Sequence, residues 1–270
     1  SGGMIAELPS TSLLLAAWVA GGLLAMAGGL TYAEMGSMYP RSGGLYVFLS
    51  EAYGPIWGFL FGWACMLVIL TGSIATVAIG FAEYFSYFFP ALGTANVLIT
   101  VPMPWGPWTI SAGQLVAAAS IALITAINYV GVQSGNLVNV VLTVVKVGLL
   151  VLLPLLALVY LRVDPAFTPV IPPSTARPLA SFGVIMIAVM WTYEGWYYVA
   201  FAAGEIKDAA RNVPRSLIFG TLALTAIYVA VNLAYVYTLS VEEMSGVTRI
   251  AEKAVTVLLG PRGAALVAAS

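Results

Sequence analysis

The chain has 270 residues, of which 61% are hydrophobic and 8% are charged, and its formal net charge is −1. About a quarter of the residues in a soluble domain are charged, so this composition excludes an ordinary soluble protein and predicts one that crosses the membrane several times. The charge balance gives no reason to expect a nucleic-acid partner. Cys65 is the only cysteine and there is no histidine, so the chain cannot supply an internal disulfide, a Cys/His metal centre or a Ser-His-Asp triad.

A spanning helix needs about 20 predominantly apolar residues. Such runs occur near residues 13–36, 54–83, 112–131, 135–161, 179–203 and 215–240. A short apolar stub at residues 1–8 precedes them, and a last span opens near residue 262. We therefore expect an all-α polytopic membrane protein. Because the chain starts without Met and stops in an apolar run at Ser270, we also expect it to be a fragment of a longer protein.

The segments between the spans differ in composition. Residues 39–44 form a turn-rich cluster, and the segment Leu45 to Tyr53 is too short to span, which predicts a re-entrant or interfacial helix. Residues 90–110 combine prolines and tryptophans without charge, which favours a loop in the interfacial aromatic belt. The proline-rich residues 162–178 predict an extended connection, and the charged residues 241–261 are expected to lie along a membrane face.

Small residues recur at four-residue spacing on two of the predicted spans, and such faces let helices approach each other closely. They are Gly21, Ala25 and Gly29 on one span and Gly54, Gly58 and Gly62 on the next.

The distribution of basic residues gives a weak indication of orientation. Lys207, Arg211 and Arg215 lie in one short loop, which favours the cytoplasm, and alternation of the spans then places Arg41 on the same side. Five basic residues fall on the opposite side, so the count alone gives no bias: Arg162, Arg177, Arg249, Lys253 and Arg262.

The segment from Trp191 to Trp196 interrupts an apolar run with a carboxylate, Glu194, and a glycine, Gly195. A carboxylate at the bilayer centre costs about 2.5–3.5 kcal/mol, so it normally faces a protein interior or a wet cavity. A helix that breaks there ends in carbonyls that attract an ammonium group and restarts with N–H groups that attract an anion. We therefore predict a binding site for a zwitterion formed by Trp191, Thr192, Tyr193, Glu194 and Gly195. The alternative is a purely structural one, a kinked helix that binds no ligand and in which Glu194 pairs with Lys146.

Lys146 lies about 16 Å into its span at 1.5 Å per residue, near the bilayer midplane. At that depth an ammonium group should face the bundle, where it can take the place of a sodium ion or lose its proton. Glu34 and Glu83 lie near span ends, where interfacial water can solvate them, and a structural role is favoured for both.

Four blocks of the sequence resemble the amino acid–polyamine–organocation permease superfamily, close to its L-type amino acid transporter branch. They are residues 32–36 with 40–46, 51–55 and 58–63, residues 127–132 with Asn139 and Lys146, residues 193–196, and residues 204–208 with 211–215. The resemblance implies a LeuT-type fold of two inverted five-helix repeats, with broken helices 1 and 6 holding the substrate. Residues 1–161 would then be the first repeat without the start of helix 1, and residues 179–270 would begin the second.

The resemblance also implies roles for individual residues. Lys146 would stand in for a sodium ion, Trp191 would gate the substrate, and the carbonyls around Trp191, Thr192 and Glu194 would receive its amino group. The Gly-Ser-Gly motif of helix 1, which binds the substrate carboxylate in the family, is expected upstream of Ser1. The remaining helices, from 8 to 12, are expected beyond Ser270, so this chain by itself should not transport.

These observations predict a secondary transporter of neutral amino acids in the inner (plasma) membrane, with a cytoplasmic N-terminus in the whole protein. It would work by sodium-independent exchange or by proton coupling, without a cofactor or metal. A cationic amino acid or polyamine transporter is the alternative within this class, because of Glu194. A non-transporting proton-relay subunit is the alternative from another class. An enzyme is not expected.

Overall fold

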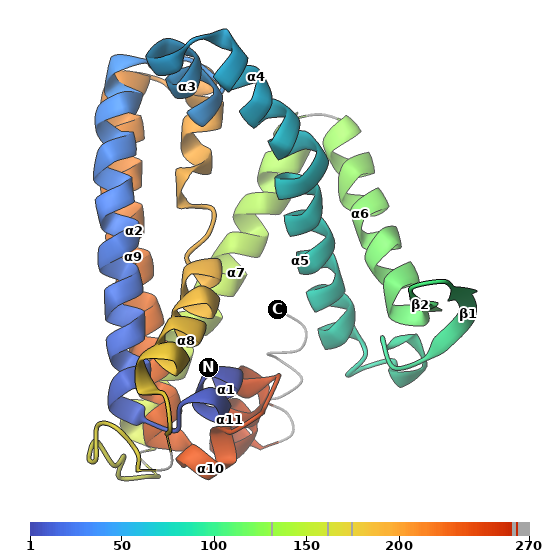
Figure 1. Ribbon diagram of the computed structural model, residues 1–270, viewed down its shortest axis with the longest axis vertical. Helices are drawn as coiled ribbons and strands as arrows, with labels where there is room; N and C mark the ends of the chain where they lie inside the picture. The colour runs from blue at the N-terminus through green and yellow to red at the C-terminus, as the bar shows by residue number, and fades with distance from the viewer. Residues whose placement is uncertain (131, 161, 174, 261–262, 264–270) are drawn as a thin grey trace. The chain divides into compact units, whose positions relative to one another are not determined.

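The computed structural model describes the chain except residues 131, 161, 174, 261–262 and 264–270 (Figure 1). Six segments in this part of the chain are long and apolar enough to cross a membrane: Thr11–Met38, Pro55–Phe85, Ala112–Tyr129, Asn139–Val159, Pro178–Glu205 and Ala209–Thr238. The predicted polytopic helical architecture and the positions of its spans are therefore confirmed. The last predicted span, which opens near residue 262, lies outside the described residues apart from Gly263.

The chain divides into two compact units, one made of Ser1–Gly62 with Leu150–Leu258 and the other containing Trp63–Leu149. The helices of the first unit, including those that continue into the second, are α1 (Gly2–Glu7), α2 (Thr11–Met38), α3 (Leu45–Tyr53), α4 (Pro55–Ala64), α7 (Val132–Val159), α8 (Pro178–Thr192), the 3₁₀ helix η3 (Trp196–Glu205), α9 (Ala209–Thr238), α10 (Val241–Met244) and α11 (Ile250–Leu259).

The long helices α2 and α9 lie side by side and form the framework of the first unit (Figure 1). The predicted small-residue face of α2 is buried. A Cβ on Gly21 would lie 2.4 Å from a Val189 methyl carbon on α8, and a Cβ on Gly22 would lie 2.3 Å from the Thr225 methyl carbon on α9. Both distances are far below van der Waals contact, so these glycines are what allow three helices to meet at one level of α2.

The second small-residue face packs against the short helix α3. A Cβ on Gly58 would lie 1.9 Å from the Ser50 hydroxyl, and one on Gly62 would lie 3.3 Å from the Tyr46 ring. Helix α3 is nine residues long, too short to span, as its sequence predicts.

One end of the first unit carries Arg41 together with the turn that leads into α9. The Gly204 N–H donates to the Ser42 hydroxyl over 3.1 Å, and the Gly43 N–H donates to the Phe201 carbonyl over 3.1 Å. Arg41 also pairs with Glu51. The sequence-based expectation that Arg41 and the basic loop after η3 share one end agrees with this arrangement.

The other end of the unit is held together by the chain segments that join α7, α8, α10 and α11. Ser10 and Ser12, at the start of α2, donate to the Val170 and Phe167 carbonyls over 2.7 and 2.6 Å. Arg162, after α7, pairs with Glu243 over 3.2 Å, and Lys253 on α11 donates to the Glu243 carbonyl. The residues predicted to lie along a membrane face thus form two short helices.

The second unit contains the π-helical turn η1 (Cys65–Ile69), α5 (Leu70–Phe85), the 3₁₀ turn η2 (Pro90–Leu92), the strands β1 (Val97–Met103) and β2 (Gly106–Ser111), and α6 (Ala112–Val130). Helices α5 and α6 pack through Ala78, Ala82 and Ala117. We expect residues 90–110 to form a loop, and the structure shows that this loop contains two strands, β1 and β2, which pair as an antiparallel hairpin. Alternating β-branched residues favour strands, and Gly106, at φ +129°, follows directly on the turn residues Pro104 and Trp105.

Candidate functional site

The fifth apolar segment, Pro178–Glu205, is interrupted where its sequence predicts. Helix α8 ends at Thr192, Tyr193 caps it, and Gly195 has φ +101° before η3 begins at Trp196. L side chains rarely adopt a positive φ, so glycine is the residue that suits this turn. The second half of the segment is wound as a 3₁₀ helix rather than as an α-helix, which tightens the chain directly after the break.

Tyr193 fixes the end of α8 to the framework. Its side chain is fully buried, and its hydroxyl donates to the Trp18 carbonyl on α2 over 3.0 Å. Its ring meets the Tyr228 ring of α9 edge-on with 5.1 Å between centroids. The whole residue is 0% exposed, so this predicted site residue lies in the core and anchors the end of α8.

The carbonyls at the break differ in whether the protein already uses them. The Thr192 carbonyl accepts the Tyr228 hydroxyl over 3.1 Å, and the Trp191 carbonyl accepts the Glu194 N–H over 3.2 Å. Within the described part of the chain, no donor reaches the carbonyls of Tyr193 and Glu194. Of the carbonyls expected to receive an amino group, that of the exposed residue Glu194 is the one without a donor among the described residues, whereas Tyr193 is fully buried.

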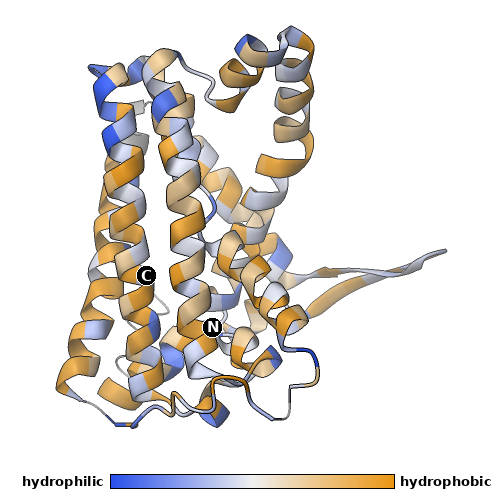
Figure 2. Cartoon of the chain, turned by 60° about the vertical axis from the view of Figure 1, so that its left-hand side comes forward, coloured by the Kyte–Doolittle hydropathy of each residue, from blue (hydrophilic) through white to orange (hydrophobic). Residues whose placement is uncertain are grey.

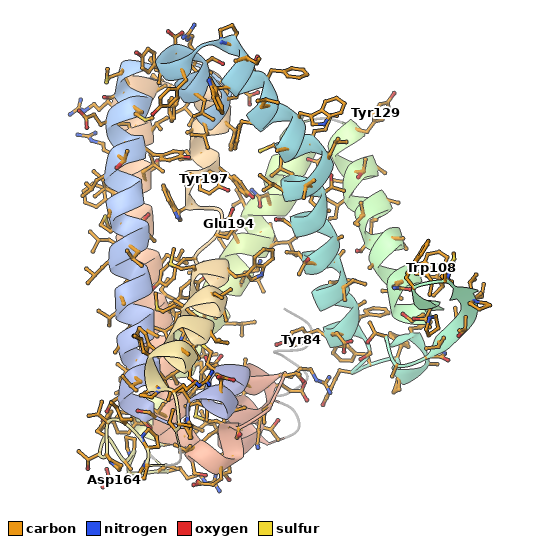
Figure 3. All side chains as sticks on the ribbon, viewed as in Figure 1. Tyr84, Trp108, Tyr129, Asp164, Glu194 and Tyr197 are labelled. Carbon is orange, nitrogen blue, oxygen red and sulfur yellow. The ribbon has the colours of Figure 1, made fainter. Side chains whose placement is uncertain are left out.

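Glu194 and Tyr197 face each other across the turn (Figure 3). The Tyr197 hydroxyl donates to the Glu194 carboxylate, which is otherwise exposed. The Tyr197 and Trp196 rings contact the Tyr32 ring of α2, with centroids 5.7 and 5.2 Å apart. Trp191, the predicted gate, is 55% exposed. One side of the break is thus lined by an aromatic cluster and a carboxylate.

Three residues of this region have a role that sequence reasoning did not assign: Trp18, Tyr32 and Tyr228. Tyr228 carried a usable signal, since a phenol within an apolar span needs a hydrogen-bond acceptor. Trp18 contributes its backbone carbonyl, and no sequence pattern identifies such a role.

The remaining predicted residues each have surroundings of their own. Lys146 is on α7 in the second unit, where its side chain is exposed and forms no ion pair with the described residues. Glu34 is exposed near the end of α2, and Glu83 accepts a hydrogen bond from the Thr94 hydroxyl. No group of three or more His, Cys, Asp or Glu side chains that could hold a metal ion occurs among the described residues.

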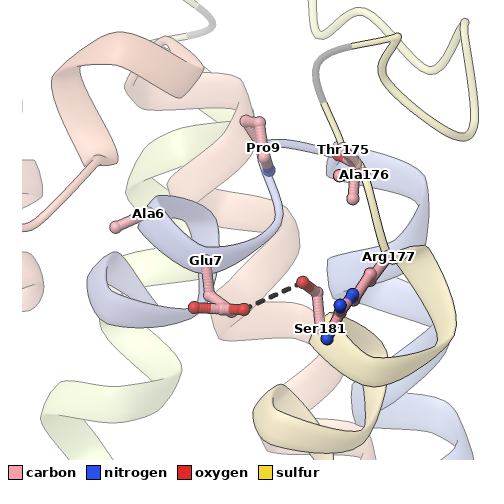
Figure 4. A pocket seen from close by; sticks show the side chains of 7 residues that line it. All are labelled: Ala6, Glu7, Pro9, Thr175, Ala176, Arg177 and Ser181. Carbon is pink, nitrogen blue, oxygen red and sulfur yellow. Dashed lines mark hydrogen bonds between the residues drawn. The ribbon is translucent and has the colours of Figure 1, made fainter.

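A hollow of about 400 Å³ lies where α1 meets the start of α8 (Figure 4). The Ser181 hydroxyl donates to the Glu7 carboxylate over 2.8 Å across it. Arg177 also lines the hollow, and like Glu7 it is exposed. The contact ties α1 to α8 at the end of the unit away from Arg41, whereas the break lies within the span.

The family model described as amino acid permease matches residues 1–269. The chain belongs to this family. It is 28% identical to the serine/threonine exchanger SteT of Bacillus subtilis over 98% of this chain and 56% of the relative. It is 30% identical to the human b(0,+)-type amino acid transporter 1, over 91% and 47% respectively.

A third relative is the human large neutral amino acids transporter small subunit 2, at 27% identity over 96% of this chain and 46% of the relative. The chain therefore spans about half the length of the curated relatives it matches. The predicted resemblance is confirmed at the level of the family. The described residues contain six segments that are long and apolar enough to cross a membrane, so this is a multi-pass membrane protein of a transporter family.

Proposed function

We propose that the complete protein carries amino acids across the membrane by alternating access, with the break between α8 and η3 as the substrate site. The observation that supports this most directly is the carbonyl of the exposed residue Glu194, which has no donor among the described residues although it lies within an apolar span. A carbonyl without a donor at membrane depth is costly unless a ligand or water satisfies it. An ammonium group carries three donors and suits such a site.

The amino group would bind at the carbonyl end of α8, where the helix dipole is negative. The substrate carboxylate would bind at N–H groups, both those that open η3 and those of the helix 1 motif expected upstream of Ser1. Trp191, which is half exposed beside the break, would close over the side chain of the substrate. In this arrangement the backbone recognises the part common to all amino acids, and selectivity is left to side chains.

Neutral amino acids are the proposed substrates, in accordance with the names of two relatives, the serine/threonine exchanger SteT and the large neutral amino acids transporter small subunit 2. Glu194 is the reason for considering the alternative substrates, cationic amino acids or polyamines. Tyr197 already donates to its carboxylate, which supports a role in shaping the site. A free carboxylate would instead recognise a cationic side chain or a polyamine. Glu194→Gln separates the two, since neutral exchange should persist in this variant while uptake of cations would be lost if Glu194 binds them.

Lys146 is proposed to replace the coupling cation, so that transport needs no sodium. The residue lies deep in an apolar segment of α7, where an ammonium group is costly without a function. Such a lysine is compatible with both modes of transport. It can act as a fixed charge in exchange or as a group that loses its proton in proton coupling.

The proposed orientation places the Arg41 end of the first unit in the cytoplasm of the cell and the whole protein in the inner (plasma) membrane. The dense basic loop after η3, with Lys207, Arg211 and Arg215, supports it. Residues 1–161 and 179–270 are proposed to belong to the two inverted repeats of the family fold.

Counter-flow of labelled amino acids in proteoliposomes that contain the complete gene product tests the proposal. We expect uptake driven by unlabelled internal amino acid, equal with and without sodium, and greatly reduced by Lys146→Ala. An imposed proton gradient distinguishes symport from exchange. Absence of uptake for every amino acid and amine tried would overturn the proposed function, and uptake that requires sodium would overturn the role of Lys146.

A further inference from the structure

Among the described residues of its own unit, the hairpin of β1 and β2 has exposed apolar side chains and unpaired strand edges. Its side chains are largely exposed, including Ile99 at 53%, Trp108 at 53% and Trp105 at 83%. Among the residues that the structure describes, the two strands pair only with each other, so the outer edge of each has open N–H and C=O groups. Figure 2 shows the hairpin extending away as a thin ribbon.

The register gives the hairpin two different faces. Ile99 lies opposite Ile110 and Val101 opposite Trp108, so these four side chains share one face. Thr100 lies opposite Thr109 on the other face. We call these the apolar face (Ile99, Val101, Trp108 and Ile110) and the threonine face (Thr100 and Thr109).

The base of the hairpin is firmly attached to the spans α5 and α6. The Ala112 N–H donates to the Asn96 carbonyl over 2.9 Å, and the Gly113 N–H donates to the Gly93 carbonyl over 3.2 Å. Ser111 and Gln114 cap α6 reciprocally, with the Gln114 side chain accepting the Ser111 N–H over 2.8 Å. Thr94 reaches back to Glu83 near the end of α5. Because the span α5 ends just before the hairpin and the span α6 begins just after it, the hairpin starts at the depth where the bilayer surface begins.

The absence of charged residues indicates which surroundings suit the hairpin. No charged residue occurs between Glu83 and Lys146, so the hairpin offers nothing to a charged partner surface. Its open edges would be unsatisfied in hydrocarbon, and its apolar face would be costly in bulk water. The interfacial zone meets both requirements, because it contains water for the edges and acyl chains for the apolar face. Trp105 at the tip and Trp108 are of the residue type that concentrates in this zone.

We propose that the β1–β2 hairpin lies in the membrane interface, with its apolar face toward the lipid chains and its threonine face toward water, and that it fixes the depth of the α5–α6 pair. The occupant of the exposed apolar face is therefore lipid. The proposal is independent of which substrate the protein carries.

Spin labels on the complete gene product in lipid nanodiscs test the proposal. In a background in which Cys65 and every other cysteine of the complete gene product are replaced by serine, single labels are placed on the apolar face by Ile99→Cys or Trp108→Cys and on the threonine face by Thr100→Cys or Thr109→Cys. Two positions calibrate the scale: Ile74→Cys, exposed on α5, for lipid, and Asp164→Cys, exposed in the connection after α7, for water. Collisions with oxygen report lipid, and collisions with a soluble nickel chelate report water.

We expect the apolar-face labels to collide more with oxygen and severalfold less with the nickel chelate than the threonine-face labels. Having two positions on each face keeps the test informative if one variant fails to fold. Nickel access on both faces equal to that at Asp164→Cys would mean that the hairpin stands in water. Protection of the apolar face from both reagents would mean that protein covers it. Either result would overturn the proposal.

Discussion

Glycine has opposite uses in α2 and at the end of α8. In α2, Gly21 and Gly22 lie within a continuous helix of 28 residues, and their missing side chains make room for Val189, Tyr193 and Thr225. At the break, a Cβ on Gly195 would lie no closer than 3.5 Å to the Tyr198 ring, an ordinary contact, but the residue has a φ of +101°. Gly21 and Gly22 are required for close helix packing, whereas Gly195 is required for the backbone conformation of the break. Glycine therefore serves both a rigid framework and an interrupted helix, and substitutions at Gly21, Gly22 and Gly195 distinguish the two roles.

The largest effect is expected at the packing glycines. Gly21→Val and Gly22→Val place side-chain atoms where neighbours already lie, which should destabilise the fold by about 1–3 kcal/mol or more and lower the melting temperature. Gly220→Ala on α9 is the matched control, since a Cβ there meets nothing within 4 Å. Thermal unfolding in detergent measures both, and an unchanged melting temperature for Gly21→Val would refute the close approach.

A smaller loss is expected at the break. Gly195→Ala forces an L side chain into a left-handed conformation at a cost of about 1–2 kcal/mol, without a steric clash. Gly195→Asn should lose less, because asparagine tolerates this region better. The ranking Asn above Ala in melting temperature is the check, and equal values for the two variants would argue against a positive φ at this residue.

Removing the Tyr193 hydroxyl should cost about 0.5–1.5 kcal/mol, because Tyr193→Phe loses the buried hydrogen bond to the Trp18 carbonyl and keeps the ring. Tyr53→Phe, at a side chain that is 71% exposed, is the control and should change stability little. A larger effect on exchange than on melting temperature would indicate that the hydroxyl positions the break. Unchanged values for both quantities would exclude the anchoring role.

The smallest effect is a pH dependence at the end of the unit away from Arg41. The Ser240 N–H and, after it, the Arg162 guanidinium hold the pKa of Glu243 below its ordinary value. The carboxylate therefore adds stability above the ordinary pKa range of a glutamate, and this contribution is lost as the pH falls through the lowered pKa. The ion pair is half exposed, so the effect is small.

Thermal unfolding between neutral and acidic pH measures this contribution. Glu243→Gln should flatten the acid side of the stability curve, whereas Glu242→Gln, at the neighbouring exposed residue, should not. Parallel curves for the wild type and Glu243→Gln would contradict the assignment.

The sequence predicted the spans, the break and the family, because long apolar runs and a glycine beside a carboxylate are local signals. It did not predict the hairpin, since several prolines obscured the strand pattern of Val97 to Met103. The Pro102–Pro107 pair is compatible with a two-stranded ribbon because both of its strands are edges.

The candidate site was only partly predictable for a different reason. The five residues from Trp191 to Gly195 could be identified from the chain, but which carbonyls are already occupied depends on Tyr228, more than thirty residues away. The inward direction of Tyr193 depends on the space above Gly21 and Gly22. These are tertiary contacts, and a single sequence does not encode them in a local pattern.

The most direct test of the account is whether an amino acid protects the break from chemical modification. In the complete gene product with Cys65→Ser, Thr192→Cys places a thiol at the end of α8, and Ile187→Cys places a control thiol earlier on the same helix, where the side chain is 73% exposed. We predict that a transported amino acid slows alkylation of Thr192→Cys and leaves Ile187→Cys unchanged. Equal alkylation rates at Thr192→Cys with and without the substrate, in a variant that still exchanges it, would contradict the proposal that the substrate binds at this break.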